Sequence, residues 1–265
     1  MPKQADLSAL PPVLTGRKAL VVGVANDRSI AWGCCAEAMR LAGAEIAMTY
    51  LNDRARPFVE PLAQQVEAPI FMPLEVRDEA QVDALFEAIG ATWGRLDILV
   101  HSIAFAPKEA LAGRVIDCPR DGFLTAMDVS CWSFLDLARR AEKLMSEGGT
   151  MLTMSYLGAN EVVENYGIMG PVKAALEATV RYLAAELGPR GIRVHAVSPG
   201  PLATRAASGI PDFDALMDRV AERAPARRLV RIEEVGAACV FLSCPYAAAM
   251  TGETLYIDGG YHILG

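Results

Sequence analysis

Residues 155–173, SYLGANEVVENYGIMGPVK, determine the interpretation of the whole sequence, because they join a strand-like segment to a helix-like one. The preceding residues 148–155, GGTMLTMS, have the apolar and β-branched character of a buried strand. Lys173 opens a segment with the apolar spacing of a long helix. In an open α/β sheet, ligands bind where a strand ends and a helix begins. The stretch therefore predicts a ligand site in an α/β fold.

Tyr166 and Lys173 in this stretch are a candidate acid and its electrostatic helper. A free phenol has a pKa of about 10 and is a poor acid at neutral pH. A nearby ammonium favours the phenolate, so Lys173 would ease proton donation by Tyr166. A single tyrosine beside a helix more often serves packing alone. The pair therefore points to chemistry only if a cofactor-binding fold surrounds it.

Strand-like and helix-like segments alternate along the rest of the chain. The expected strands are residues 17–24, 45–50, 69–76, 96–105, 148–155, 192–201 and 253–260. The expected helices are one from residue 30 that ends at Gly43, and residues 56–65, 80–92, 123–145, 171–187, 211–223 and 233–243. This alternation predicts a Rossmann-type, doubly wound, seven-stranded parallel sheet with helices on both faces. We expect a single domain over residues 1–265, with residues 1–13 as a loosely ordered lead-in.

The composition is typical of a soluble cytoplasmic protein. Hydrophobic residues make up 52% of the 265 residues, and the net charge is −7 without a run of Lys or Arg. This argues against nucleic acid or a membrane as the main partner. The six cysteines form no CxxC pair and no metal-like spacing with the three histidines, so no metal site is expected. We expect neither a signal peptide nor a membrane-spanning segment.

The turn after the first expected strand, GVANDRSIAWG at residues 23–33, is where such a fold binds a pyrophosphate. The turn does not match GxGxxG, so its glycines alone are a weak signal. Gly23 still permits close backbone approach, and Gly33 would let the helix lie closely on the sheet. Ser29 can either cap the helix or face a phosphate, and capping is the more common role.

Together these segments resemble the short-chain dehydrogenase/reductase superfamily, and within it the divergent enoyl-acyl-carrier-protein reductases of bacterial fatty acid synthesis. The resemblance covers residues 14–260. It rests on GVANDRSIAWG, TYLND, HSIAFAP, SYLG, NYGIMGPVKAALEA, GPLATRAASGI and IDGG. Where the ordinary superfamily pattern has the tyrosine of Tyr-x3-Lys, this chain has Met169, and Tyr156 takes the place of the usual serine. The Tyr-x6-Lys spacing of Tyr166 and Lys173 is the mark of the enoyl-reductase branch.

The resemblance implies reduction of trans-2-enoyl thioesters carried by acyl carrier protein, with a nicotinamide dinucleotide (NAD) as cofactor. Tyr166 would stabilise the enolate through a hydrogen bond to the thioester carbonyl, Lys173 would hold the nicotinamide ribose, and Tyr156 would flank the substrate. The residues implied to line the dinucleotide are Gly23, Ser29, Ile30, Leu51, Glu75, Val76, Ile103, Lys173, Leu202, Ala203, Thr204, Arg205 and Ala206. Those implied to border the substrate are Ala106, Tyr156 and Met169.

Two positions bear on the choice of cofactor. Leu51 stands where other members have Gln or Arg, and it offers no charge to a 2′-phosphate. We therefore expect NADH to be preferred, with NADPH as the alternative if Arg54 or Arg56 reaches the ribose. Glu75 stands where Asp is common beside the adenine.

Two local features leave structural alternatives open. If Gly170 is the N-cap, Pro171 is the first helical residue and Tyr166 lies outside the helix, whereas a helix that begins near residue 165 would be interrupted by Pro171. The segment 202–210, LATRAASGI, is expected to be a mobile lid that closes over the cofactor. The alternative is that this segment is a permanently ordered connection. Within it, Arg205 would either face solvent and meet the acidic carrier protein or reach a phosphate.

Two other functions stay open at this point. A carbonyl reductase or dehydrogenase acting on another small substrate would keep the fold, but Met169 argues against it. A non-catalytic dinucleotide-binding protein is disfavoured by the intact Tyr166 and Lys173. The resemblance also implies a homotetramer, for which the helices at residues 123–145 and 171–187 are interface candidates if they do more than cover the sheet.

Overall fold

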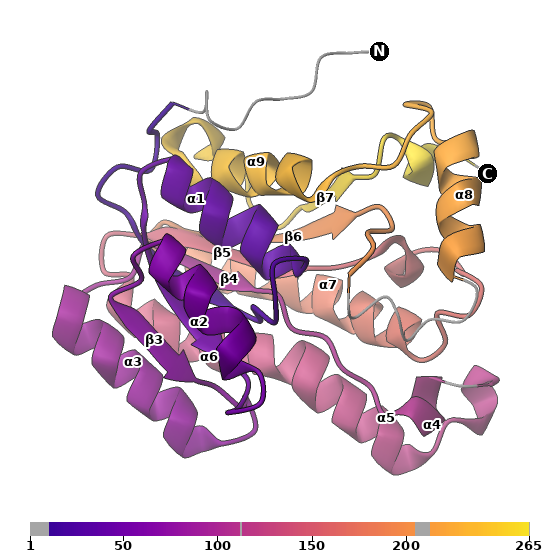
Figure 1. Ribbon diagram of the computed structural model, residues 1–265, viewed down its shortest axis with the longest axis horizontal. Helices are drawn as coiled ribbons and strands as arrows, with labels where there is room; N and C mark the ends of the chain where they lie inside the picture. The colour runs from indigo at the N-terminus through magenta and orange to yellow at the C-terminus, as the bar shows by residue number, and fades with distance from the viewer. Residues whose placement is uncertain (1–10, 112, 205–212, 265) are drawn as a thin grey trace.

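A seven-stranded sheet with the order β3-β2-β1-β4-β5-β6-β7 forms the middle of the molecule (Figure 1). The structure, a computed structural model, describes residues 11–111, 113–204 and 213–264, apart from the side chains of residues 34–36. The strands are β1 (Lys18–Val22), β2 (Glu45–Tyr50), β3 (Ile70–Pro73), β4 (Ile98–His101), β5 (Gly149–Met154), β6 (Ile192–Pro199) and β7 (Thr254–Ile257). Every neighbouring pair is parallel. The predicted doubly wound, parallel architecture is confirmed.

Helices cover both faces of this sheet (Figure 1). Those packed on one face are η2 (Ala31–Glu37), α1 (Ala38–Leu41), α2 (Arg56–Gln65) and α9 (Ile232–Ser243). Those on the other are α3 (Glu79–Trp93), α6 (Ser133–Ala141) and α7 (Met169–Leu187). The helices α4 (Lys108–Leu111), α5 (Arg120–Met127) and α8 (Phe213–Arg223) lie toward the carboxyl ends of the strands. None of the described helices is long and apolar enough to cross a membrane.

Burial on both faces explains the continuous apolar character of the strands. In β1, Ala19 and Val21 pack in the core on the α9 side, whereas Leu20 and Val22 pack in the core on the α7 side. All four side chains are fully buried. Since successive side chains of a strand point to opposite faces, a strand covered on both sides must be apolar at every position.

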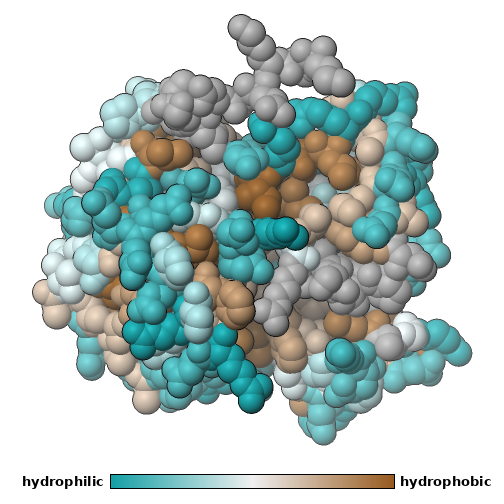
Figure 2. Space-filling view, viewed as in Figure 1, coloured by the Kyte–Doolittle hydropathy of each residue, from teal (hydrophilic) through white to brown (hydrophobic). Residues whose placement is uncertain are grey.

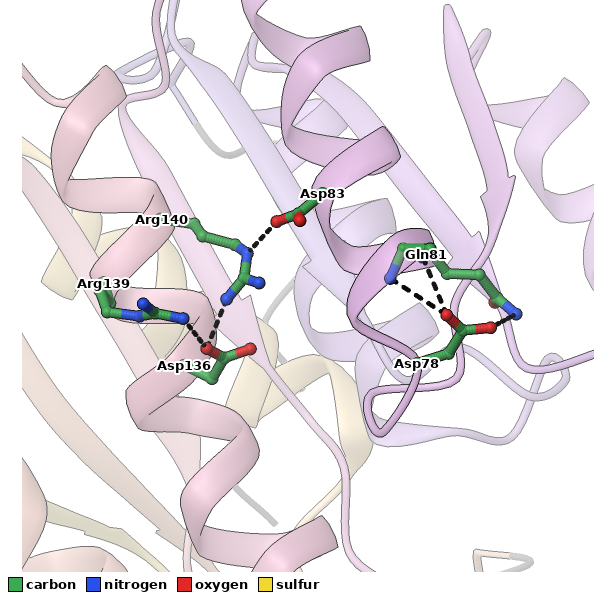
Figure 3. Close-up of polar contacts among 7 residues, drawn as sticks. Asp78, Gln81, Asp83, Asp136, Arg139 and Arg140 are labelled. Carbon is green, nitrogen blue, oxygen red and sulfur yellow. Dashed lines mark hydrogen bonds and ion pairs between the residues drawn. The ribbon is translucent and has the colours of Figure 1, made fainter.

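A side-chain cap fixes the start of α3 and the end of β3 together (Figure 3). The carboxylate of Asp78 accepts the backbone N–H of Ala80 at 3.1 Å and the side-chain amide of Gln81 at 2.8 Å. The side-chain oxygen of Gln81, Oε1, accepts the backbone N–H of Glu75 at 2.9 Å. The cap therefore positions Glu75, which follows β3.

Ion pairs join α6 to α3 on the far side of the sheet from α9 (Figure 3). Arg140 donates from Nε to Asp83 of α3 at 2.8 Å and also pairs with Asp136 one turn earlier. Arg139 donates to the same Asp136 at 2.7 Å. Because Asp136 and the Arg140 side chain are largely buried, the ion pair between them is screened less by water than an exposed pair would be.

The helix expected at residues 123–145 begins earlier and is not uniform. It consists of α5, the π-helical segment η4 (Asp128–Trp132), α6 and the 3-10 turn η5 (Glu142–Leu144). Within this region Ser133 donates to the carbonyl oxygen of Val129, and Ser130 exchanges hydrogen bonds with the backbone of Phe105. Such side-chain bonds to the backbone compete with regular α-helical pairing. The chain between β4 and α5 contains α4 and the 3-10 turn η3 (Val115–Asp117).

The start of α7 settles the alternatives at Pro171. Ile168 is the N-cap and Met169 the first helical residue, so the helix starts between the two positions that were considered, near residue 165 and after Gly170. Pro171 is the third helical residue, where its missing N–H has no intrahelical partner to lose. Tyr166 precedes the helix, as the alternative with a start near Gly170 predicted.

Two of the three histidines are buried inside the sheet, His101 in β4 and His195 in β6. Burial lowers the pKa of His101 from 6.5 to about 3, and that of His195 from 6.5 to about 4. The unfolded chain takes up both protons near pH 6.5, but the folded chain does so only at much lower pH. The contribution of these two histidines to the free energy of unfolding is therefore at its maximum above pH 6.5, and it falls as the pH drops toward the folded pKa values.

We predict that the free energy of unfolding falls by up to about 1.4 kcal/mol per pH unit for each of these histidines between pH 6.5 and 5.5. His101→Asn should show a shallower fall than the wild type, whatever its stability at pH 7.5. Urea unfolding at equal protein concentration measures the slopes, with His262→Asn, at a partly exposed position, as the control. Equal slopes for wild type and His101→Asn would contradict the prediction.

Candidate active site

The expected site residues follow the carboxyl ends of the strands, and they centre on the place where β1 and β4 lie side by side. Gly23 follows β1 with φ +103°, a conformation that favours glycine. A Cβ atom on Gly23 would lie 2.1 Å from the carbonyl oxygen of Ser102 and 3.3 Å from a side-chain carbon of Ile103. The backbones after β1 and β4 therefore approach closely at the switch point of the sheet, where ligands bind in doubly wound folds.

Ser29 caps the helical segment that follows this turn. Its hydroxyl donates to the carbonyl oxygen of Asn26 at 2.7 Å and accepts the N–H of Trp32 at 3.4 Å. The first N–H groups of such a segment, including that of Ile30, have no intrahelical acceptor and favour an anion. Gly33 was expected to let the helix lie closely on the sheet, but the structure places it against another helix. A Cβ atom at Gly33 would lie 2.1 Å from the side chain of Ile232 in α9. The glycine instead lets two helices on the same face pack closely.

The residues expected at the adenine end follow β2 and β3, on the other side of β1 from the tyrosines. Leu51 is 54% exposed. Glu75 pairs with Arg77 at 3.2 Å, and Val76 packs against the core on the α3 side. Arg56 pairs with Glu60 at 2.9 Å.

The segment after β6 is described only in part. Leu202 is buried in the core, Ala203 is exposed, and the N–H of Thr204 donates to the carbonyl oxygen of Leu202 at 2.7 Å. Arg205, Ala206 and the rest of the expected lid lie outside the described residues.

The two tyrosines of the central stretch lie in contact. The ring centroids of Tyr156 and Tyr166 are 4.8 Å apart, with an angle of 57° between the rings. The ring of Tyr166 rests on the backbone of Gly158, where a Cβ atom would lie 2.4 Å from Cδ1 of the tyrosine. Only glycine at this position allows Tyr166 to lie there undisturbed.

A small apolar cluster surrounds Tyr166, separate from the two cores of the sheet. We call it the tyrosine cluster, and its buried members are Ala106, Ala110, Ala126, Tyr166, Ile168, Met169 and Val172. Tyr156 packs against it while partly buried. The structure thus gathers around Tyr166 the three residues that were expected to border the substrate. Only 9% of the Tyr166 residue surface is exposed.

Lys173 extends from the first turns of α7 to the end of β5. Its Nζ donates to the carbonyl oxygen of Met154 at 2.7 Å, and the residue is 4% exposed. Burial lowers the pKa of Lys173 from 10.5 to about 8, against the opposing effects of Cys131 and Glu177. A lysine with this pKa is mostly an ammonium at pH 7.

Burial raises the pKa of Tyr166 far above 10, and the charges of Tyr156 and Glu177 add to the increase. This direction is opposite to the one expected from an adjacent ammonium, so Lys173 does not make Tyr166 a better acid here. Burial also raises the pKa of Tyr156, to about 12. Both phenols therefore keep their protons at neutral pH and can donate hydrogen bonds.

Sequence reasoning missed the polar side chains beneath these residues. His101 contacts Thr153 of β5 and Ser133 of α6, each at 2.8 Å. Glu177 is buried one helical turn after Lys173 and accepts hydrogen bonds from Ser155 and Asn160. The Lys-x3-Glu spacing could have indicated Glu177, because residues four apart share a helix face. No local pattern indicates Asn160.

Comparisons with known proteins show the family to which the chain is similar. The family model described as enoyl-(acyl carrier protein) reductase matches residues 23–262. Enoyl-acyl-carrier-protein reductase (NADH) 1 of Rhizobium meliloti is 47% identical over 96% of this chain and 93% of its own. The NADH-dependent reductase FabI of Synechocystis is 45% identical over 95% of this chain and 98% of its own.

Solved structures give the same result. The Bacillus cereus enoyl-acyl carrier protein reductase, in complex with NADP+ and an indole naphthyridinone, has a TM-score of 0.93 and 45% identity over 96% of this chain and 99% of that one. The enzyme from Anaplasma phagocytophilum in complex with NAD has a TM-score of 0.92 and 44% identity over 96% of both chains.

We predict that Gly23→Ala destabilises the fold and abolishes dinucleotide binding, because its Cβ would displace the backbone at Ser102. Gly94→Ala is the matched control: Gly94 also has positive φ, +70°, but its Cβ would meet open space. The control should lose about 1 kcal/mol of unfolding free energy, from backbone strain alone. Urea unfolding and a fluorescence titration with NADH measure the two effects. Equal losses of stability, or intact binding in Gly23→Ala, would contradict the role of close backbone approach.

Proposed function

The chain belongs to the enoyl-(acyl carrier protein) reductase family, and we propose that it reduces the trans-2 double bond of enoyl-acyl-carrier-protein thioesters with NADH. The observation that carries the proposal is the buried pair formed by Tyr166 and Lys173 at the carboxyl edge of the sheet. One side chain provides a neutral hydrogen-bond donor within an apolar cluster, and the other provides a buried ammonium. The reductases at 47% and 45% identity support the substrate and the cofactor.

The residues present fit a dinucleotide. Gly23 allows the backbones after β1 and β4 to approach, and the N-terminal end of η2 offers unpaired N–H groups to a pyrophosphate. The preference for NADH is supported by Leu51, which carries no charge, and by Arg56, which is engaged by Glu60. A 2′-phosphate would need a cation at this end of the site, and Arg54 is the other arginine near enough in the sequence to supply it.

We assign Tyr166 the role of stabilising charge on the substrate. Bound NADH would supply a hydride for the β-carbon of the enoyl chain, and the α-carbon would take up a proton. As the hydride adds, negative charge develops on the thioester oxygen. The O–H of Tyr166, which keeps its proton, donates a hydrogen bond to that oxygen. This bond is stronger to the enolate than to the ground-state carbonyl, so it lowers the barrier.

The apolar surroundings of Tyr166 support this role. The tyrosine cluster excludes water from the donor, and a hydrogen bond is electrostatically stronger where the local dielectric is low. Met169 and Ala106 in the same cluster offer apolar contact to an acyl chain. Figure 2 shows apolar side chains gathered in the middle of this face, between the side that carries α2 and the corner that carries α4 and α5.

We assign Lys173 the role of binding the nicotinamide ribose. Its ammonium is fixed by the carbonyl oxygen of Met154, which leaves two further N–H donors for ribose hydroxyls. Charge-assisted bonds of this kind are shorter and stronger than neutral ones. Tyr156, in ring contact with Tyr166, would flank the substrate and hold the Tyr166 ring in place.

The acyl carrier protein is the proposed partner, and a homotetramer in the cytoplasm is the proposed state. Large apolar side chains are exposed on the two helical regions named as interface candidates. They are Phe123, Leu124, Trp132 and Tyr182. Burial of such side chains between copies would remove them from water. The free thiols of Cys118, Cys131 and Cys244 fit a reducing compartment.

We predict that the purified protein oxidises NADH in the presence of a crotonyl thioester and not in the presence of an acetoacetyl thioester. The reason is that Tyr166 is placed for an enolate oxygen, while Met169 takes the position of the acid that carbonyl reduction would need. Absorbance at 340 nm follows both reactions, and NADPH is compared in parallel. Activity confined to the ketoacyl thioester would indicate a carbonyl reductase, and no activity with either, despite NADH binding, would indicate a non-catalytic protein.

A further inference from the structure

A carboxylate is buried one helical turn after Lys173. Glu177 lies on the same face of α7 as Lys173, and only 4% of it is exposed. A charged carboxylate in such a position is costly unless its oxygens accept hydrogen bonds or face a positive charge. The partners of Glu177 therefore indicate what it does.

Both oxygens of Glu177 are occupied by donors from outside the helix. Ser155, directly after β5, donates its hydroxyl to Oε1. Asn160 donates from Nδ2 to Oε2 at 3.0 Å and also to the hydroxyl of Tyr256, in β7, at 2.8 Å. These donors fix the position of the Glu177 carboxylate relative to Ser155, which precedes Tyr156, and relative to β7 at the edge of the sheet.

Lys173 has few other charged neighbours among the described residues. His101, on β4, is neutral, because burial lowers its pKa to about 3. Its Nε2 donates to Ser133, since the Ser133 hydroxyl proton is already given to Val129. Cys131, on η4, is a neutral thiol at pH 7, because burial raises its pKa above 9.0. Of the groups that act on Lys173, Glu177 therefore remains as the source of negative charge.

The aromatic hydroxyls around Glu177 are also neutral. Burial raises the pKa values of Tyr166 and, on β7, Tyr256, and the charge of Glu177 contributes to both increases. Asp258 and Glu161 also act on Tyr256, and neither is among the groups that act on Lys173. The same carboxylate thus favours the protonated form of the phenol and of the lysine.

We propose that Glu177 is a positioning residue for the reaction: its carboxylate, fixed by Ser155 and Asn160, keeps Lys173 in the ammonium form against the carbonyl oxygen of Met154. The inference rests on the proposed function, since it assigns a support to the lysine that holds the ribose. Burial lowers the pKa of Lys173 to about 8 even with Glu177 present. Without the carboxylate, the neutral amine would be populated at physiological pH, and charge-assisted binding of the ribose would be lost.

The test compares Glu177→Gln with wild type in two measurements between pH 6 and 9.5. The first is kcat/KM for NADH with a crotonyl thioester, whose alkaline limb reports the free enzyme. The second is the dissociation constant for NADH from fluorescence, which needs no turnover. We expect the alkaline limb of both to move down by about one pH unit in Glu177→Gln, with affinity at pH 8 weakened about five-fold.

Three further variants separate electrostatics from structure. Glu177→Asp keeps the charge and should keep the limb near its wild-type position even if activity falls. Glu186→Gln, at an exposed glutamate of the same helix, should change neither measurement. Asn160→Ala, at an exposed turn, removes one donor to the carboxylate and should move the limb in the same direction by a smaller amount. This variant carries the test if Glu177→Gln does not fold.

An unchanged alkaline limb in folded Glu177→Gln, or in Asn160→Ala if Glu177→Gln does not fold, would overturn the inference. Equal activity losses in Glu177→Gln and Glu177→Asp without a shift in pH would do the same, since they would show a purely structural role. If the wild-type protein binds NADH but does not reduce the thioester, the proposed function fails. The pH dependence of NADH binding still decides the role of Glu177 in that case.

Discussion

A buried hydrogen bond from Lys173 to the carbonyl oxygen of Met154 joins α7 to the end of β5, and the arrangement of the site depends on it. A lysine at this depth loses its hydration, so it must be compensated by a carbonyl oxygen, a carboxylate or a ligand. The bond fixes the rotation of α7 about its axis. That rotation in turn places Glu177 one turn after the lysine on the same face of α7. It also places Tyr166, which lies just before the helix, over Gly158.

The same helix start divides two chemical environments. Before Met169 the chain contributes Tyr166 to a small apolar cluster, and after it α7 contributes a lysine and a glutamate to a polar layer under the strands' carboxyl ends. Burial acts on both sides in the same sense, because it disfavours charge on the phenol and on the lysine alike. The phenol stays neutral as a result, whereas the lysine stays charged because Glu177 is beside it. A donor and a cation are thereby held a few residues apart in one segment.

Much of this architecture could be predicted from the sequence, because local signals were strong. The limits of β2 and α2 agree with expectation, since a continuous apolar run marks β2 and an early proline marks α2. The tyrosines and Lys173 were found from their spacing, and the contact between Tyr156 and Tyr166 follows from the turn at Gly158. The less regular elements were not found, because the π-helical segment η4 coincides with tertiary bonds from Ser130 to Phe105, and α4 is a single turn in a connection. Electrostatic shifts also escaped prediction, since burial outweighs the effect of a neighbouring charge on Tyr166.

The central claim is that the hydroxyl of Tyr166, rather than that of Tyr156, stabilises the developing charge on the substrate. Single-turnover reduction of a crotonyl thioester by Tyr166→Phe and by Tyr156→Phe, each saturated with NADH, tests it most directly. The account predicts that Tyr166→Phe loses about 100-fold or more in rate while its NADH affinity stays near that of the wild type, and that Tyr156→Phe loses much less. A wild-type rate in Tyr166→Phe, or a larger loss in Tyr156→Phe, would contradict the account.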